Sequence, residues 1–130
     1  MRHRLQTSFV ARLATVGDDG RPHIVPICFG LEDETLYFAI DFKPKRTTNL
    51  KRVRNLTANP AVSVLVDHYE ANWNRLWWVR VDGSARLLTE PDQAEHALNL
   101  LAQRYEQYQT TRPSGPVVAI SIERISGWSA

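Results

Sequence analysis

The sequence contains a single cysteine, Cys28, and its four histidines are far apart. A lone cysteine excludes an internal disulfide, and the scattered histidines do not have the spacing of a zinc site. No apolar run approaches the roughly 20 residues that a membrane-spanning helix needs. The first residues also lack the apolar core of a signal peptide. These absences predict a cytoplasmic protein without a metal site, a membrane segment or a disulfide framework.

The chain also has little excess charge, with a formal net charge of +2 over 130 residues. A protein that coats nucleic acid usually has a larger positive excess. Hydrophobic residues make up 43% of the chain, which is enough for a core and too many for a disordered chain. We therefore expect one compact domain over residues 1–130.

Alternating apolar residues predict six strands. The expected strands are residues 9–16, 21–29, 35–40, 61–69, 76–88 and 116–125. Short turns separate the first three strands, so we expect these to form an antiparallel meander. The second strand is apolar on both faces, which predicts that both faces are covered. Pro22 and Pro26 in this strand indicate a bulge, an edge or a point where a ligand meets the backbone.

Two longer helices are expected between these strands. The first begins after an N-cap at Thr47 or Thr48 and ends before Asn59-Pro60. The second begins near Thr89, and its apolar stripe is expected to cover the sheet. Gly83 is expected to bend the fifth strand. The order of elements predicts a mainly β fold, a small six-stranded antiparallel barrel with few helices that closes its own edges.

Six cations lie between Lys43 and Arg54 with no acidic residue among them. The simplest interpretation is a solvated helix face. However, Lys45 and Arg46 come just before the expected helix start, where the helix dipole disfavours positive charge. Free amides and nearby cations at such a position are the usual parts of a phosphate site. The cluster therefore indicates an anion-binding site.

Nucleic acid and a phosphorylated cofactor are the two anions to compare. Nucleic acid would need cations spread over a surface with exposed aromatic side chains. The pair Trp77-Trp78 lies in an alternating strand, so at least one ring faces the interior or an interface. The phosphorylated cofactor is favoured, and nucleic acid stays an alternative.

Several short motifs follow one another along nearly the whole chain. They are FVARLATV (9–16), GRPHIVP (20–26), LYFAID (36–41), KPKRT (43–47), RNL (54–56), NPAVS (59–63), LWWVRVDG (76–83) and the terminal pair Gly127-Trp128. In this order they resemble the flavin/deazaflavin oxidoreductases with the split β-barrel fold, which are related to pyridoxamine 5′-phosphate oxidase. KPKRT and the Trp-Trp pair resemble the branch that uses the deazaflavin coenzyme F-420. The FMN branch more often has a shorter Ser/Thr-Arg-Lys segment here.

The resemblance implies a homodimer with the cofactor at the subunit interface and hydride transfer to a small electron-poor organic acceptor. The F-420 tail carries a phosphodiester and several glutamates, so a longer cationic segment suits it better than FMN. Two alternatives stay open. One is an FMN-dependent oxidase or reductase, and the other is a non-catalytic protein that binds a cofactor or a tetrapyrrole.

The resemblance also assigns site residues. Val25 and Pro26, together with Ile40 and Asp41, would line the ring site. The phosphate or acidic tail would be held by Lys45, Arg46, Thr48, Asn49, Lys51 and Arg52. Trp78 and Arg80 would reach the same pocket, from the same subunit or from its partner. No catalytic acid is evident, and a proton would come from solvent or from His68, Tyr69 or Arg80.

Overall fold

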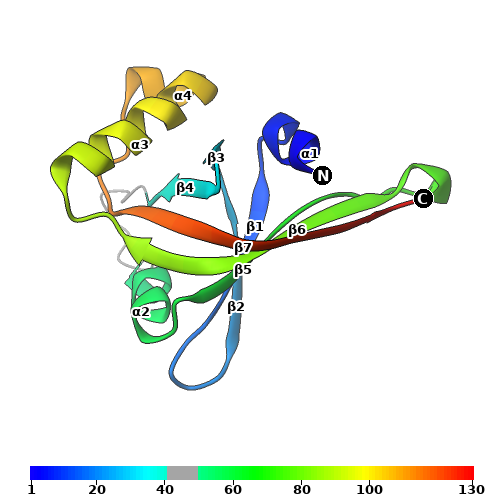
Figure 1. Cartoon of the computed structure of the whole chain (residues 1–130), viewed down its shortest axis with the longest axis horizontal. Helices are drawn as coiled ribbons and strands as arrows, with labels where there is room; N and C mark the ends of the chain where they lie inside the picture. Colours follow the sequence, from blue (N-terminus) through cyan, green and yellow to red (C-terminus); the bar gives the residue numbers. More distant parts are fainter. Residues whose placement is uncertain (41–49) are drawn as a thin grey trace.

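The computed structural model describes residues 1–40 and 50–130, which form a curled antiparallel sheet with helices around it (Figure 1). The described strands are β1 (Ala11–Val16), β2 (Pro22–Ile27), β3 (Gly30–Glu32), β4 (Thr35–Ala39), β5 (Ala61–His68), β6 (Trp77–Leu87) and β7 (Val117–Ser129). The helices are α1 (Arg2–Thr7), α2 (Leu50–Ala58), α3 (Pro91–Arg104) and α4 (Glu106–Thr110), with a 3-10 turn at Trp73–Arg75. The expected mainly β architecture with few helices is confirmed.

The sheet contains seven described strands in the order β2-β1-β5-β6-β7-β4-β3, so the predicted number of six is wrong. The missing strand is β3, whose three residues are too short to show a period. The predicted meander is also wrong, because β2 pairs with β1 whereas β4 pairs with β3 and β7. Strands β2 and β3 lie at opposite edges of this sheet, which therefore does not close its own edges as expected.

The core lies on the inner face of the curled sheet. Alternate residues of β1, β5 and β6 point inward, and Leu13, Val64 and Val81 are fully buried there. The second strand follows this rule only in part. Ile27 is buried, but Ile24 on the opposite face is 66% exposed, so the prediction that both faces are covered is wrong for the single chain. Of the three alternatives for Pro22 and Pro26, the edge position is the one observed, because β2 is an edge strand of this sheet.

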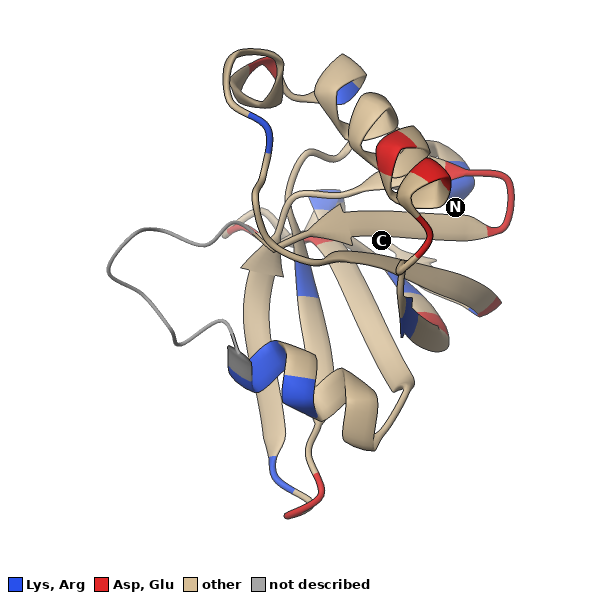
Figure 2. Ribbon diagram, turned by 90° about the vertical axis from the view of Figure 1, so that its left-hand side faces the viewer, with Lys and Arg blue, Asp and Glu red and all other residues tan. Residues whose placement is uncertain are grey.

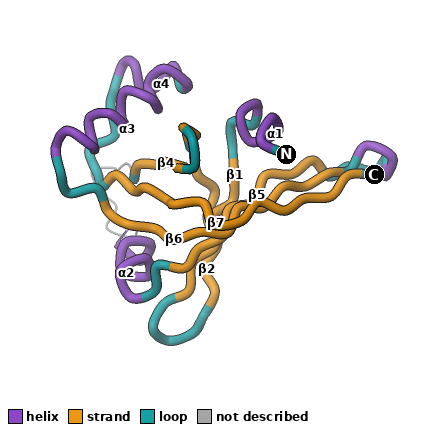
Figure 3. The backbone as a smooth tube through the Cα atoms, viewed as in Figure 1, coloured by secondary structure: helices purple, strands orange, loops and turns teal. Residues whose placement is uncertain are grey.

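Strand β6 is bent where the sequence indicated. Its register with β7 shifts between Asp82 and Gly83, which is the signature of a β-bulge. Strands β5, β6 and β7 extend together as an arm that ends near the C-terminus (Figure 3). Two of these strands, β5 and β6, contribute residues to the candidate site described below.

Two neighbouring residues at the end of α3 attach the N-terminal segment to the domain. Arg104 donates hydrogen bonds to the carbonyl oxygens of Gln6 at 2.7 Å and Leu5 at 3.3 Å, and also to that of Ser8. The hydroxyl of Tyr105 accepts from the Phe29 amide at 2.9 Å and lies 2.7 Å from the Phe9 carbonyl oxygen. These bonds satisfy carbonyl groups at the end of α1, which no helical partner can reach.

Replacing Tyr105 with phenylalanine should destabilise the fold by about 1–3 kcal/mol, because the buried Phe29 amide loses its acceptor. The ring stays in place, so its edge-on contacts with Phe9 and Tyr108 are kept. Tyr37→Phe is the matched control, because none of the hydrogen bonds found among the described residues involves the Tyr37 hydroxyl. Urea unfolding of both variants measures the difference. Equal midpoints for the two variants would show that the Tyr105 hydroxyl contributes little.

No helix in residues 1–40 and 50–130 is long and apolar enough to cross a membrane.

Candidate functional site

The outer face of the sheet contains an open cavity of about 590 Å³. Its floor and walls come from outward-pointing residues of β1, β2, β5 and β6 and from the loop after β5. The apolar lining is Ala14, Ile24, Leu65, Tyr69 and Trp78. The polar lining is Arg12, Ser63, Asp67 and Arg80. A volume between roughly 300 and 1,000 Å³ with mixed apolar and charged walls is typical of a small-molecule site.

Strand register places two arginines in one row across this cavity. Arg12 on β1 is paired with Leu65 on β5, and Leu65 is paired with Arg80 on β6. Neighbouring strands lie about 4.8 Å apart, so the two arginine Cα atoms are roughly 10 Å apart. Their side chains leave the sheet on the same side, with one leucine between them.

A small polar network fixes Arg80. Its Nε donates to the Asp82 carboxylate at 3.3 Å, and the same carboxylate accepts a 2.6 Å hydrogen bond from the Ser63 hydroxyl. The guanidinium carbon lies 5.8 Å from the centre of the Trp78 ring, within the range of a cation–π contact. The guanidinium is therefore held beside the ring and still has its terminal N–H groups available for a ligand.

Helix α2 lies on the other face of the sheet. Its Asn55 donates a 3.2 Å hydrogen bond to the hydroxyl of Thr15, a buried inward-pointing residue of β1. Leu56 packs into the core beside it. Lys51 is exposed and Arg52 is half-buried, and burial lowers the pKa of the Arg52 guanidinium from its usual value. Figure 2 shows the Lys and Arg positions along this helix.

A buried polar atom without a partner lies near this helix. His23 is paired with Thr15 across β1 and β2, so it shares the inner face on which α2 packs. Its Nδ1 is buried and has no hydrogen-bond partner among the residues that the structure describes. A buried atom of this kind usually signals a missing partner, such as a ligand or an ordered water.

The residues expected at the site fall into separate groups. Pro26, Trp78 and Arg80 lie on the outer face. Val25 packs against the core and Ile40 is 1% exposed, so a contact of Ile40 with a ring would have to come from its backbone. Lys51 and Arg52 lie on α2, on the inner face of the sheet. Asp41, Lys45, Arg46, Thr48 and Asn49 are outside the described residues, as are both expected N-cap threonines.

Arg12 was not predicted as a site residue, although it lines the cavity. It is the one charged residue in the segment 9–16, and its neighbours Ala11 and Leu13 are fully buried. That alternation could have placed Arg12 on the outer face. The row that it forms with Arg80 could not have been found, because it depends on the pairing of β5 with both β1 and β6.

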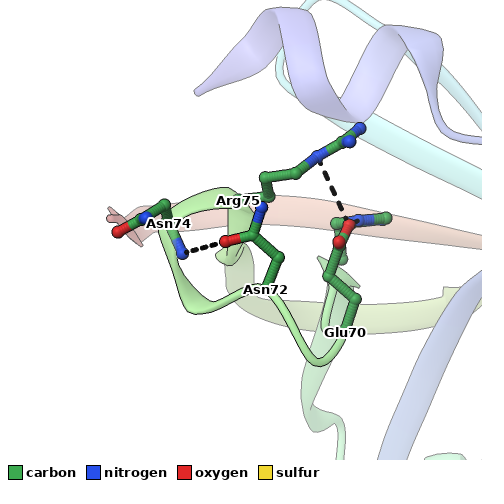
Figure 4. A network of polar contacts seen from close by, with 5 residues as sticks. Glu70, Asn72, Asn74 and Arg75 are labelled. Carbon is green, nitrogen blue, oxygen red and sulfur yellow. Dashed lines mark hydrogen bonds and ion pairs between the residues drawn. The ribbon is translucent and has the colours of Figure 1, made fainter.

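The loop that joins β5 to β6 contains a second network (Figure 4). The Glu70 carboxylate contacts Nε2 of His68 and forms an ion pair with Nε of Arg75 at 3.4 Å. The Asn72 side chain accepts from the Asn74 amide at 3.2 Å and caps the 3-10 turn. The hydrogen bond to His68 and the charge of Arg75 lower the pKa of Glu70 from its usual 4.5. His68 is therefore engaged in the loop, whereas Tyr69 and Arg80 line the cavity.

Replacing His68 with alanine should raise the pKa of Glu70 towards 4.5, because the hydrogen bond to His68 is the main cause of its lowering. A lowered carboxyl pKa stabilises the folded loop above the ordinary pKa, and that contribution is lost as the pH falls through the folded value. A carboxyl-carbon NMR titration of wild type and variant measures the change. Asp19, which lies outside this loop, is the internal control. A Glu70 pKa that stays equally low in the variant would show that Arg75 is the main cause.

Cys28 does not have the properties of a reactive thiol. Burial raises its pKa from the usual value, and the hydrogen bond with Tyr108 only partly offsets this. A raised pKa keeps the sulfur protonated and weakly nucleophilic at neutral pH. Among the described residues, no three His, Cys, Asp or Glu side chains are arranged to hold a metal ion.

Comparison with known proteins identifies the family. A family model described as pyridoxamine 5′-phosphate oxidase matches residues 1–129, and the chain belongs to this family of split β-barrels. A comparison with curated proteins found no match.

Solved structures with the same fold have different descriptions. A FAD-binding protein from Mesorhizobium loti is 27% identical, with a TM-score of 0.71, over 97% of this chain and 89% of that chain. A conserved hypothetical protein from Mycobacterium tuberculosis is 23% identical, with a TM-score of 0.76, over 98% and 81%. The heme storage protein HutZ from Vibrio cholerae is 18% identical, with a TM-score of 0.76, over 98% and 90%. The last two likenesses show the fold alone.

Proposed function

We propose that the protein is an oxidoreductase that uses the deazaflavin coenzyme F-420 to transfer hydride to a small electron-poor organic acceptor. The observation that carries this proposal is the cavity of about 590 Å³ with Trp78 and Arg80 on its wall, on a chain of the pyridoxamine 5′-phosphate oxidase family. The cavity has the size and the aromatic wall that a flat ring needs. The FAD-binding relative supports a flavin-like ring in general.

The anionic part of the cofactor would be held elsewhere. Lys51 and Arg52 on α2 supply two cations, and the unpartnered Nδ1 of His23 lies on the same inner face. The remaining cations of the segment, Lys43 to Arg46, lie outside the described residues. A long acidic tail needs several cations, and this is why F-420 is favoured over FMN.

A second copy of the chain is part of the proposal. Lys51 and Arg52 lie on the inner face of the sheet, whereas Trp78 and Arg80 lie on the outer face. In this proposal, the ring and the acidic tail of one cofactor are therefore held by different chains. In a homodimer, the outer face of one copy would meet the α2 region of the other. The exposed Ile24 on that outer face is the kind of apolar residue that an interface covers.

When bound, the reduced deazaflavin supplies the hydride, so the protein contributes binding and orientation. Trp78 would support the flat ring, and Arg80, fixed by Asp82, would orient a polar group beside it. The apolar side chains Leu65 and Ile24 would exclude water from the reacting region. Tyr69 also lines the cavity and would be the phenol that gives a proton to a bound acceptor.

A turnover assay tests the proposed chemistry. Reduced F-420 is mixed with the protein and with a quinone, a nitroarene or an enone, and the return of oxidised F-420 fluorescence is followed. We expect the protein to accelerate reoxidation with at least one acceptor. The Trp78→Ala variant should accelerate it less than the wild type does. Failure of the protein to accelerate reoxidation with all three acceptor classes would contradict the proposal.

The two alternatives make different binding predictions. An FMN-dependent enzyme would bind FMN more tightly than F-420. A non-catalytic binding protein would bind hemin or another tetrapyrrole and would not accelerate hydride transfer. The fold shared with HutZ is compatible with this third reading but does not favour it, because the two sequences are only 18% identical.

A further inference from the structure

The two arginines in the outer-face cavity differ in their polar contacts. Arg80 is held by Asp82 through its Nε at 3.3 Å. Arg12 has no ion pair and no side-chain hydrogen bond among the residues that the structure describes. Asp67 is the only acidic residue in the lining. The cavity therefore contains one arginine that is already oriented and one whose five N–H donors are available.

The position of Arg12 makes those donors useful to a ligand. Arg12 and Arg80 stand on either side of Leu65 in one row of the sheet. Each side chain is long enough to lean over the leucine, so both guanidinium groups can approach one acidic group. A guanidinium fork matches the geometry of a carboxylate and is the usual way in which proteins recognise one.

The rest of the cavity suits the flat apolar body of such a ligand. Trp78 and Tyr69 offer aromatic surfaces, and Leu65 with Ala14 forms an apolar floor. The floor is made of β-strand residues, along which a planar molecule can lie. An acidic group at one end and an aromatic body at the other would satisfy both parts of the lining.

We propose that this cavity takes, beside the cofactor ring on Trp78, the hydride acceptor as a planar organic acid, with its acidic group held by Arg12 and Arg80. The proposal rests on the proposed function and adds the chemical class of the acceptor. The acidic tail of the cofactor is a less suitable occupant, because in the proposed homodimer the α2 cations of the second copy hold that tail. Carboxylates of a second copy are another occupant, and the experiment distinguishes them.

The test compares two fluorescent probes of nearly the same shape and different charge. The full chain is titrated with 1-anilinonaphthalene-8-sulfonate, which is anionic, and with N-phenyl-1-naphthylamine, which is neutral. We expect the sulfonate to bind more tightly. Arg12→Gln should weaken sulfonate binding about tenfold, the usual effect of losing one charged hydrogen bond. Binding of the neutral probe should change less than twofold.

Matched variants keep the result interpretable. Arg124→Gln removes an exposed arginine that lies opposite Asp82 in the register of β6 and β7 but does not line the cavity. This variant should leave sulfonate binding within twofold of wild type. Arg12→Lys keeps the charge without the fork and should give an intermediate affinity. Sedimentation of each variant reports the association of two copies, and thermal unfolding confirms that it is folded.

Three results would overturn the proposal. The two probes could bind equally, Arg12→Gln could leave the sulfonate affinity unchanged, or Arg124→Gln could weaken it as much as Arg12→Gln does. Loss of self-association in Arg12→Gln with unchanged sulfonate binding would assign Arg12 to the second copy instead. F-420 binding to the wild type is measured separately, and its absence would overturn the proposed function while the probe comparison still decides whether the cavity binds planar acids.

Discussion

Replacing Lys51 and Arg52 together with alanine is expected to weaken F-420 binding about a hundredfold. Each charged hydrogen bond contributes roughly 1.5–3 kcal/mol, and two such bonds correspond to at least this change in the dissociation constant. Folding should be little affected, because α2 is anchored by Leu56 and by the Asn55 hydrogen bond to Thr15. Fluorescence titration at low and moderate salt measures the loss.

The control is Arg54→Ala on the same helix. Arg54 is exposed and comes two residues after Arg52, so it points away from Arg52. It lies three residues after Lys51, on the same side as that residue, so it is a control for Arg52. It should change F-420 affinity less than threefold. Lys51→Ala alone removes only an exposed cation and should weaken F-420 binding about tenfold. This single variant shows the effect of charge loss even if replacing Arg52 also lowers stability. Equal losses in Arg54→Ala and the double variant would indicate a diffuse charge effect instead of a site.

A mixing experiment tests whether two copies share the site. Neither the double α2 variant nor Trp78→Ala should bind F-420 well by itself. When the two variants are coexpressed in equal amounts, half of the dimers contain one chain of each variant. Each mixed dimer has one intact site, so about a quarter of the wild-type binding should return. If nothing returns, although mixed dimers are isolated through a different affinity tag on each variant, all the binding residues come from one chain.

Gly83→Ala is expected to destabilise the fold by about 3 kcal/mol, which lowers the unfolding midpoint by roughly 10 °C. A Cβ atom at this position would lie 2.3 Å from the Ser121 carbonyl oxygen and 2.9 Å from a methyl group of Ile120. The nearer obstacle is backbone, so β7 would have to move away from β6. The bulge also positions Asp82, which binds Arg80 and Ser63 in the candidate site.

Gly20→Ala is the control for Gly83→Ala. Gly20 has a φ of +76° in the turn between β1 and β2, but a Cβ atom there would meet nothing within 4 Å. Its replacement should cost only the conformational strain of about 1 kcal/mol. Differential scanning calorimetry of the two variants separates a steric clash from this strain. Equal midpoints would show that β7 adapts at Gly83 without cost.

Local sequence signals predicted most of the elements but not their pairing. Alternation located β1, β5 and β6, and Gly83 marked the bulge, because these features depend on neighbouring residues. The pairing of β4 with β7 joins segments about 80 residues apart, and no local signal contains it. Strand β3 was missed because a three-residue strand shows no period. The exposed face of β2 was missed because an exposed apolar residue such as Ile24 looks like a core residue in the sequence.

In the candidate site, too, some features depend on local sequence and others depend on strand pairing. The cations of α2 could be predicted from charge and helix position alone. The outward direction of Arg12 follows from the alternation in its strand, whereas the burial of Ile40 depends on how the sheet curls around its core. The row from Arg12 through Leu65 to Arg80 depends on two strand registers at once. Chemistry that several strands build together is therefore seen only in the folded chain.

The most direct test of the account is a side-by-side titration of the purified protein with F-420 and FMN, followed by tryptophan fluorescence. Trp78 on the cavity wall makes the signal sensitive to a ring bound there. The account predicts tight binding of F-420 and binding of FMN that is at least tenfold weaker. Tighter binding of FMN would place the protein in the FMN branch, and binding of neither would contradict the proposed function.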